Sequence, residues 1–368
     1  MFGHYIEPPW SDGIVNTVKG WSEGLAKLGL KVTVLSTSSN RKRELVSDHV
    51  NYTYFFGTHE RFGFDSTYTI RFQLNLFNFL LRKHSYEVYH FHLLDALTYI
   101  PLFSMLKSIG GKLFLSFHNK DNVNKYTKKL VHRIFQFIIV PTEEVKDFLT
   151  RLGMPEHKIG VVPPCVNTKR FRPKDTDFCR RTLGLPEDAF VIVYAGHFKH
   201  GRGLEQLISV FERLKRPSNR KMLLLLAWTG FAEKGYFPRI QERARNNSDI
   251  VMIGPQNDMS LVYNCANVVV SPISGSKYVT AIPLNVIEAM ACGRVVVSTS
   301  IGVRGFLKDG LNGFVVKPNN PIALKRRLSL VLNEEANIER IGNQARDAIC
   351  AKFSESEVAL RLRELYES

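Results

Sequence analysis

The sequence predicts an α/β protein built of two doubly wound, mostly parallel sheets. Short apolar runs alternate with amphipathic helical stretches along nearly the whole chain, and several of these runs are apolar at every position. Continuous apolar runs are typical of strands that helices cover on both faces. The chain has 368 residues, which is too long for one ordinary core and suits two domains. Alternation and length together predict the fold class.

Each element is predicted from that alternation. In the N-terminal half we expect strands at Lys31–Ser36, Tyr52–Phe56, Val88–Phe91, Lys112–Phe117, Phe137–Val140 and Gly160–Val162. In the C-terminal half we expect them at Phe190–Ala195, Met222–Ala227, Ile250–Ile253, Val268–Ser271, Val295–Ser298 and Phe314–Val316. Helical patterns lie between them, among others at Ile14–Leu28, Ala96–Lys107, Glu143–Arg151, Leu204–Leu214 and Pro321–Leu332. Only Phe2–Ile6 precede Pro8 and Pro9, so the first strand is either trimmed or brief.

A proline-rich, basic stretch separates the two halves. The segment Pro163–Pro186 contains PPCVNTKRFRPKD, and we predict it to be the hinge. The predicted organisation is therefore an N-terminal domain over 1–165, a linker over 166–186, a C-terminal domain over 187–350 and a last segment over 351–368.

Composition indicates a protein with free cysteine thiols and without a membrane-spanning segment. The start of the chain lacks a basic segment followed by an apolar one, so we predict no signal peptide. The longest apolar run, Met222–Trp228, is far shorter than the roughly 20 residues that cross a bilayer. The five cysteines are scattered without a CxxC pair, which favours free thiols over disulfides or a zinc site. We expect a cytoplasmic protein, at most peripheral at the inner face of a membrane.

The formal net charge of +16 is the unusual feature of the composition. Such a charge suggests an anionic partner, whether nucleic acid, a membrane surface or a phosphorylated substrate. No zinc-finger spacing or basic zipper accompanies it, so we expect no nucleic acid partner. Two basic and aromatic stretches, Arg71–Lys83 and Lys120–Phe137, fit helices that lie on anionic lipid. Helices with a core-facing stripe and a solvated basic face fit them equally well.

The strongest motif is TAIPLNVIEAMACGRVVVS, residues 280–298. Pro283 stands where a helix begins and Gly293 where it ends. Glu288 is an acidic residue in this otherwise apolar helix, and a buried carboxylate needs a partner. Adjacent hydroxyls of a sugar suit it, because one carboxylate accepts hydrogen bonds from both. The alternative is that Glu288 faces solvent or pairs with an arginine.

The second motif is AGHFKHGRG, between a predicted strand and the helix Leu204–Leu214. A glycine-flanked turn at a helix start offers backbone N–H groups and the positive end of the helix dipole. Four side chains add donors or positive charge, namely His197, Lys199, His200 and Arg202. The combination suits a pyrophosphate, and a solvated basic loop is the alternative.

Two other classes of nucleotide-binding protein are excluded by their missing motifs. Gly196 and Gly201 have the spacing of a Walker A loop, but Arg202 and Gly203 follow in place of Lys and Ser or Thr. Without the lysine and the hydroxyl, the contacts to phosphate and magnesium are lost, so an ATPase is not expected. No GxGxxG motif opens either half, so the nicotinamide fingerprint is also missing.

Two candidates lie in the N-terminal half. Gly13 lies with Asp12 in a predicted turn and would let the backbone approach a ligand, and a plain turn glycine is the alternative. His118 ends the strand pattern Lys112–Phe117, and carboxyl ends of strands face the ligand crevice in doubly wound sheets. We therefore expect His118 to contact an acceptor hydroxyl, and His90 and His92 to be packing residues.

Together these motifs resemble the retaining GT-B glycosyltransferases of family four (glycosyl transferases group 1) over nearly the whole chain. The matching pieces are PPWSDGIVNTVKGWSEGLAKLGLKVTVLS, VYHFH, KIGVVPPCVNTKRFRP, AGHFKHGRGLEQLISVFERL, SPISGSKYVTAIPLNVIEAMACGRVVVS and IGVRGFLKDGLNGFVV. The resemblance implies two Rossmann-like domains facing a central cleft, an N-terminal acceptor domain and a C-terminal nucleotide-sugar domain. It also implies that the last helix, Glu355–Tyr366, crosses back to the N-terminal domain.

The resemblance further implies a metal-independent site without a cofactor, the nucleotide-sugar being a substrate. Glu288 matches a glutamate that holds ribose hydroxyls, and Arg202 stands in the place of a phosphate-binding lysine. The donor site implied in this way comprises Gly13, His197, Lys199, Arg202, Ile282, Pro283, Leu284 and Glu288. The implied catalytic positions are His118, near the transferred sugar, and Thr280.

The chain departs from the family pattern at several of these positions. Thr280 stands where the first of two motif glutamates is expected, His197 replaces an arginine and Gly305 replaces a glutamate. We predict a retaining transferase that moves a hexose from a nucleotide-sugar to a lipid-linked or cell-surface glycan, such as a polyprenyl-phosphate-linked acceptor at an anionic membrane. The alternative is a catalytically weak GT-B module that binds sugar nucleotides as a regulatory subunit.

Overall fold

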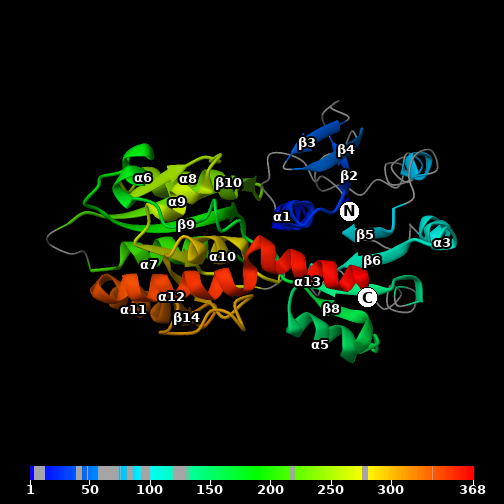
Figure 1. The fold of residues 1–368 in the computed structure, drawn as a ribbon. Coiled ribbons are helices and arrows are strands. Elements are labelled where there is room, and N and C mark those ends of the chain that lie inside the picture. The colour runs from blue at the N-terminus through cyan, green and yellow to red at the C-terminus, as the bar shows by residue number, and fades with distance from the viewer. Residues whose placement is uncertain are drawn as a thin grey trace. The chain divides into compact units, whose positions relative to one another are not determined.

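The computed structural model describes residues 1–3, 13–38, 44–47, 49–56, 74, 76–80, 86–92, 100–118, 131, 133–215, 220–275, 281–333 and 335–368. The chain forms two compact units. Unit 1 comprises Met1–Cys165 together with Glu355–Ser368, and unit 2 comprises Val166–Ser354. Each unit is built around its own twisted sheet with helices packed against it (Figure 1).

Unit 1 contains an eight-stranded sheet in the order β3-β4-β2-β1-β5-β6-β7-β8. Its strands are β1 (Phe2–Gly3), β2 (Val32–Ser38), β3 (Glu44–Ser47), β4 (Val50–Phe56), β5 (Val88–His92), β6 (Lys112–Ser116), β7 (Phe137–Val140) and β8 (Ile159–Val161). All neighbours run parallel except β3 and β4, which are antiparallel. The sequence did not predict β3, because this edge strand is only four residues long and begins with a charge.

The helices of unit 1 include one from the far end of the chain. They are α1 (Gly13–Lys27), α3 (Ile100–Ser108), α5 (Glu143–Arg151) and α13 (Glu355–Glu367), with a short 3-10 helix at Glu156–Lys158. The helices α1 and α13 share a core in which Trp21 and Leu25 pack with Val358 and Leu362. A Cβ atom on Gly24 of α1 would lie 2.9 Å from the Ala359 Cβ atom, so a glycine is needed for this close approach.

Unit 2 contains a six-stranded, fully parallel sheet in the order β11-β10-β9-β12-β13-β14. Its strands are β9 (Phe190–Phe198), β10 (Met222–Ala232), β11 (Ile250–Ile253), β12 (Val268–Ser271), β13 (Val295–Thr299) and β14 (Phe314–Val316). Its helices are α6 (Thr176–Thr182), α7 (Leu204–Glu212), α8 (Tyr236–Arg245), α9 (Met259–Asn264), α10 (Leu284–Ala291), α11 (Pro321–Asn333) and α12 (Glu335–Phe353). The chain moves outward from β9 to β11 and then returns to β12 beside β9, so the strand order reverses between β9 and β12.

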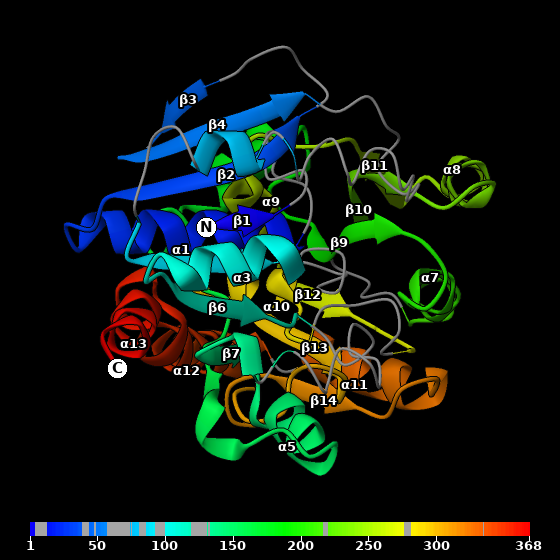
Figure 2. The same ribbon diagram turned by 90° about the vertical axis from the view of Figure 1, so that its right-hand side faces the viewer.

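The apolar runs of unit 2 contribute side chains to two hydrophobic cores, one on each face of the sheet. Val191 and Val193 of β9 point to the core that contains α9, α10 and α12. The alternating residues Ile192 and Tyr194 point to the core that contains α7, α8 and α11. Figure 2 shows α7 and α8 on one side of this sheet and α10 on the other. Because side chains alternate along a strand, burial on both faces explains why these runs lack polar positions.

Several predicted boundaries differ from the structure. The strand β10 continues to Ala232 rather than ending at Ala227. The strand β9 continues to Phe198 rather than ending at Ala195, so His197 lies in a strand and not in the following loop. The predicted hinge Pro163–Pro186 contains the helix α6, and its apolar residues Phe171 and Cys179 are buried in the core of unit 2. Apolar side chains within the basic run give this segment a packing role that its prolines did not indicate.

The structure also tests two expectations that were drawn from composition, one about the cysteines and one about membrane-spanning helices. All five cysteines are free thiols, and four of them are buried. Within the part of the chain that the structure describes, no helix combines the length and the apolar character needed to cross a bilayer.

Candidate functional site

The carboxyl ends of β9, β12 and β13 in unit 2 bring three loops together. The loop after β9 contains Gly203, which has a φ of 70° and whose added Cβ atom would lie 1.9 Å from the carbonyl oxygen of Pro272, after β12. The backbone N–H of Ser274 donates to the carbonyl oxygen of Gly201 at 2.9 Å. In the loop after β13, a Cβ atom on Gly302 would lie 2.8 Å from Pro283 Cδ. Glycine is therefore required where these loops meet, at the point of the sheet where doubly wound folds bind ligands.

The helix α10 begins at this junction. Pro283 is its N-cap residue, with φ −71° and ψ 116°, rather than the first helical residue. The Asn285 side-chain amide donates to the carbonyl oxygen of Ala195 at 3.1 Å and to Ser271 Oγ at 3.3 Å. Asn285 thus ties the start of α10 to the ends of β9 and β12, and the first-turn N–H groups provide a partial positive charge there.

Glu288 lies one turn into α10 and is half-buried. The hydroxyl of Tyr263, on α9, donates to Glu288 Oε2 at 2.8 Å. Burial raises the pKa of the Glu288 carboxyl to about 7, while the Tyr263 hydrogen bond and the positive charge of Arg170 act in the opposite direction. Arg170 itself is paired with Asp258 at 3.4 Å. The carboxyl of Glu288 is thus held by a neutral phenol, and it can accept a further hydrogen bond when ionised.

The basic residues after β9 are arranged in two ways. His200 is engaged with Glu233, whose Oε2 accepts from the His200 backbone N–H at 3.1 Å and contacts His200 Nδ1 at 2.9 Å. Lys199 and Arg202 are partly exposed, and the Lys199 ammonium lies 6.0 Å from the centre of the Phe231 ring. His200 is therefore paired within the unit. Lys199 and Arg202 lie in the loop after β9, which contacts the loop after β12 at Pro272 and Ser274.

The structure places most predicted donor residues around this junction. Ile282, Pro283, Leu284 and Glu288 follow β12, while His197, Lys199 and Arg202 follow or end β9. The ring of His197 lies 5.2 Å from that of Phe231, and its carbonyl oxygen accepts from the Tyr194 hydroxyl at 2.7 Å. Thr280 lies outside the described residues. Gly13 belongs to unit 1, where it is the first residue of α1 and accepts from Thr17 Oγ1 at 2.7 Å.

A histidine cluster lies at the carboxyl ends of β5 and β6 in unit 1. His118 follows β6 and is only 8% exposed, and its Nε2 atom lies 3.1 Å from Nδ1 of His92. His90 is held between Ser116 and Tyr366, each at 2.6 Å from a ring nitrogen. Burial and the neighbouring histidines hold the pKa values of His90 and His92 well below the usual range, so both rings are neutral near pH 7.

Trp21 of α1 covers this cluster. Its ring centroid lies 5.6 Å from that of His92 and 6.2 Å from that of His118. The indole N–H donates to the carbonyl oxygen of Pro163 at 3.0 Å, which fixes the ring. His90 is a packing residue, as predicted. His92 differs from that prediction, since it contacts His118 and its buried Nε2 atom has no hydrogen-bond partner among the described residues.

Sequence reasoning missed Tyr263, Asn285, His92 and Trp21. Two of them carried a signal, because a tyrosine or tryptophan in an apolar stretch needs a partner for its polar atom when buried. That rule does not identify the residue to which the polar atom of the tyrosine or tryptophan bonds. The pairing of Tyr263 with Glu288 and of Trp21 with the histidines depends on contacts between segments far apart in the sequence.

Family models match both halves of the chain. Residues 11–170 match Glycosyltransferase Family 4, and residues 175–348 match Glycosyl transferases group 1. The chain belongs to this glycosyltransferase family. The sequence resemblance is therefore confirmed, and the two units with their parallel sheets are those of the GT-B fold.

Individual relatives and solved structures agree with this assignment. The chain is 26% identical over 238 residues to the lipopolysaccharide 1,2-N-acetylglucosaminetransferase of Salmonella typhimurium, which covers 62% of this chain and 61% of that protein. Sucrose-phosphate synthase of Thermosynechococcus elongatus has a TM-score of 0.79 at 20% identity, covering 97% and 93% of the two chains. HepE of Anabaena, solved with UDP-glucose, has a TM-score of 0.78 at 14% identity, covering 100% and 98%. The chain spans about half to three fifths of the length of the curated relatives it matches.

Proposed function

We propose that this protein transfers a hexose from a nucleotide-diphosphate sugar to a glycan hydroxyl, with retention of anomeric configuration and without a metal ion. The observation that carries the proposal is Glu288, a half-buried carboxyl with a pKa of about 7 at the strand-order reversal of unit 2. An ionised carboxylate at this position suits two neighbouring ribose hydroxyls. The fold neighbour HepE of Anabaena was solved with UDP and with UDP-glucose, which supports a nucleotide-sugar as donor.

The residues around Glu288 suit a diphosphate leaving group. The first-turn N–H groups of α10 and the cationic side chains of Lys199 and Arg202 supply positive charge at the same junction. As the bond between sugar and diphosphate breaks, negative charge develops on the phosphate oxygens, and fixed donors stabilise it more in the transition state than in the ground state. The acceptor hydroxyl then forms the new bond to the sugar carbon while its proton passes to the departing phosphate. His118 is proposed to hold a hydroxyl of the transferred sugar or the acceptor.

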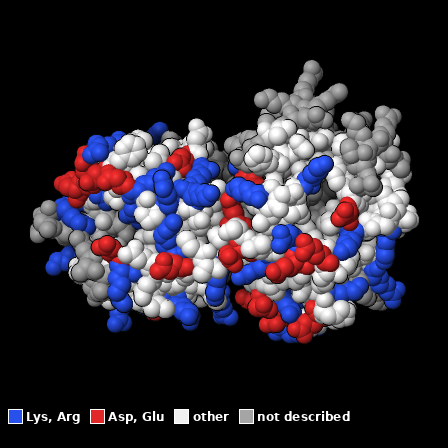
Figure 3. Space-filling model, in the orientation of Figure 1, with Lys and Arg blue, Asp and Glu red and all other residues white. Residues whose placement is uncertain are grey.

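The acceptor is proposed to be a lipid-linked or cell-surface glycan. The relative from Salmonella typhimurium is named as a lipopolysaccharide transferase, and the net charge of +16 suits an anionic membrane. Among the residues that the structure describes, Lys and Arg side chains are interspersed with Asp and Glu on the face that Figure 3 shows. That distribution favours weak, salt-sensitive attraction to a surface over a dedicated nucleic-acid groove.

One observation favours a second function, that of a catalytically weak module that binds sugar nucleotides as a regulatory subunit. Thr280 stands where the family has the first motif glutamate, and His197 replaces an arginine. Both functions need donor binding, but only the first needs turnover.

Titration calorimetry with UDP-, GDP- and ADP-sugars, followed by nucleotide-release assays with polyprenyl-phosphate glycans, separates these functions. We expect binding to one nucleotide class and release that EDTA does not abolish. Failure of every sugar nucleotide to bind at millimolar concentration would overturn both functions. Binding without turnover on any acceptor would favour the regulatory subunit. Flotation with anionic and neutral liposomes tests the membrane surface, and equal recovery from the two would contradict it.

A further inference from the structure

Tyr263 is a buried residue whose hydroxyl group contacts Glu288 of the candidate site. Its side chain is 1% exposed, and its ring packs in the core between the sheet, α9 and α10. The neighbouring ring of Phe171 lies 6.1 Å away. Its hydroxyl donates to Glu288 Oε2 at 2.8 Å. A phenol held by packing on all sides has one direction in which to donate, so it fixes the position of the oxygen that accepts from it.

We propose that Tyr263 is the positioning residue for the Glu288 carboxylate, which it orients from the core side. The proposal rests on the proposed function only for the identity of the ligand. Among the described residues, the charged and titratable groups that act on Glu288 include Tyr263 on α9, Arg170 before α6 and Cys292 at the end of α10. Tyr263 is the group among them that donates a hydrogen bond to the carboxyl. Removal of its hydroxyl therefore leaves the ionised form of Glu288 without the donor that favours it.

The test is Tyr263→Phe, which keeps the ring and removes the hydroxyl. Carbon-13 NMR of labelled Glu side chains in the ligand-free protein is expected to show the Glu288 titration displaced to higher pH. Nucleotide affinity at pH 7 is expected to fall about tenfold, the loss of roughly one hydrogen bond to a charged group. Tyr236→Phe, on the opposite face of the same sheet, is the matched control and should change neither measurement.

An unchanged Glu288 titration in folded Tyr263→Phe protein would overturn the proposal. Because that titration needs no ligand, it still decides the role of Tyr263 if every nucleotide fails to bind. A failure of binding alone counts against the proposed function and leaves the positioning role to be judged by NMR.

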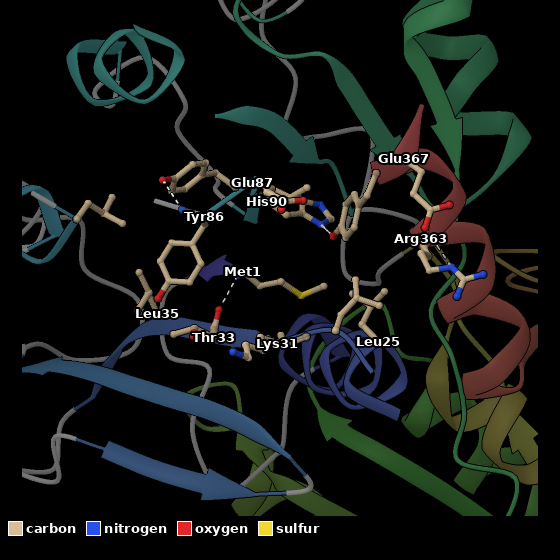
Figure 4. A pocket seen from close by; sticks show the side chains of 16 residues that line it. Met1, Leu25, Lys31, Thr33, Leu35, Tyr86, Glu87, His90, Arg363 and Glu367 are labelled. Atoms are coloured by element: carbon tan, nitrogen blue, oxygen red, sulfur yellow. Dashed lines mark hydrogen bonds and ion pairs between the residues drawn. The ribbon is translucent and has the colours of Figure 1, made fainter. Parts of the chain in front are cut away.

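A cavity of about 610 Å³ lies in unit 1, at the amino ends of β2 and β5 (Figure 4). One wall is formed by Lys31, Val32 and Thr33, and the opposite wall by Glu87, Val88 and Tyr89. All of its lining residues belong to unit 1, so it is not part of the site that Tyr263 and Glu288 form in unit 2.

Discussion

Each unit presents polar groups at the carboxyl ends of the parallel strands of its own sheet, but the two units bury these groups differently. In unit 2, Glu288 is half-buried beside a helix start, and its pKa is about 7. In unit 1, His92 and His118 are buried under Trp21, and burial keeps His92 neutral at pH 7. One edge therefore offers a titratable charge and helix N–H groups, and the other offers the uncharged ring of His92.

This difference indicates a division of work under the proposed function. Positive charge and an ionisable carboxylate suit the diphosphate and ribose of a donor. A neutral imidazole such as that of His92 suits hydroxyls, because it donates or accepts without introducing a charge. Changes in unit 1 should therefore affect turnover, and changes in unit 2 should affect nucleotide affinity.

The largest expected effect is that of His118→Ala in unit 1. We expect kcat to fall at least 100-fold, on the order of the loss of one preorganised donor in a transition state. The Kd for the free nucleotide diphosphate should stay within about twofold, since the residues proposed to bind it lie in unit 2. Steady-state kinetics and calorimetry on the same preparation measure both. A parallel loss of nucleotide affinity would contradict the division.

The next effect is that of Glu288→Gln in unit 2. The amide keeps the size of the side chain but cannot accept with a full charge, so nucleotide affinity should fall by about 2 kcal/mol, or roughly 30-fold. The same substitution should matter much less for a 2′-deoxynucleotide, which lacks one of the two hydroxyls. Calorimetry with both nucleotides checks this. Equal losses of affinity for the two nucleotides would contradict the proposal that Glu288 binds the ribose hydroxyls.

A pH series sharpens the comparison further. With a pKa of about 7, Glu288 is mostly protonated at pH 6 and mostly ionised at pH 8. Hydroxyls favour the ionised form, so nucleotide affinity should rise about tenfold from pH 6 to pH 8, one pH unit below the pKa costing a factor of ten. Glu288→Gln should flatten this part of the profile, while Tyr236→Phe should not. A wild-type affinity that falls over this range would mean that the protonated carboxyl binds.

Sequence patterns predicted much of this architecture, and the reason lies in periodicity. The strands of unit 2 are apolar on both faces because both cores need them, so their positions are visible in the sequence. Glu288 is visible because an acid in an apolar helix is unusual. The partner of Glu288 was not predictable, since Tyr263 reaches it only through the packing of α9 against α10. The strand β3 was missed because four residues carry too little periodicity.

The smallest expected effect separates long-range charge from direct contact within unit 2. Lys199 is partly exposed after the carboxyl end of β9, whereas Lys221 is exposed before the amino end of β10. Lys199→Ala should weaken diphosphate binding about threefold at low salt, as expected for an exposed charge, and the effect should shrink as salt rises. Lys221→Ala makes the same change of net charge at the opposite edge and should have no effect. Equal losses from both substitutions would mean that the overall charge of the unit, rather than the loop after β9, attracts the nucleotide.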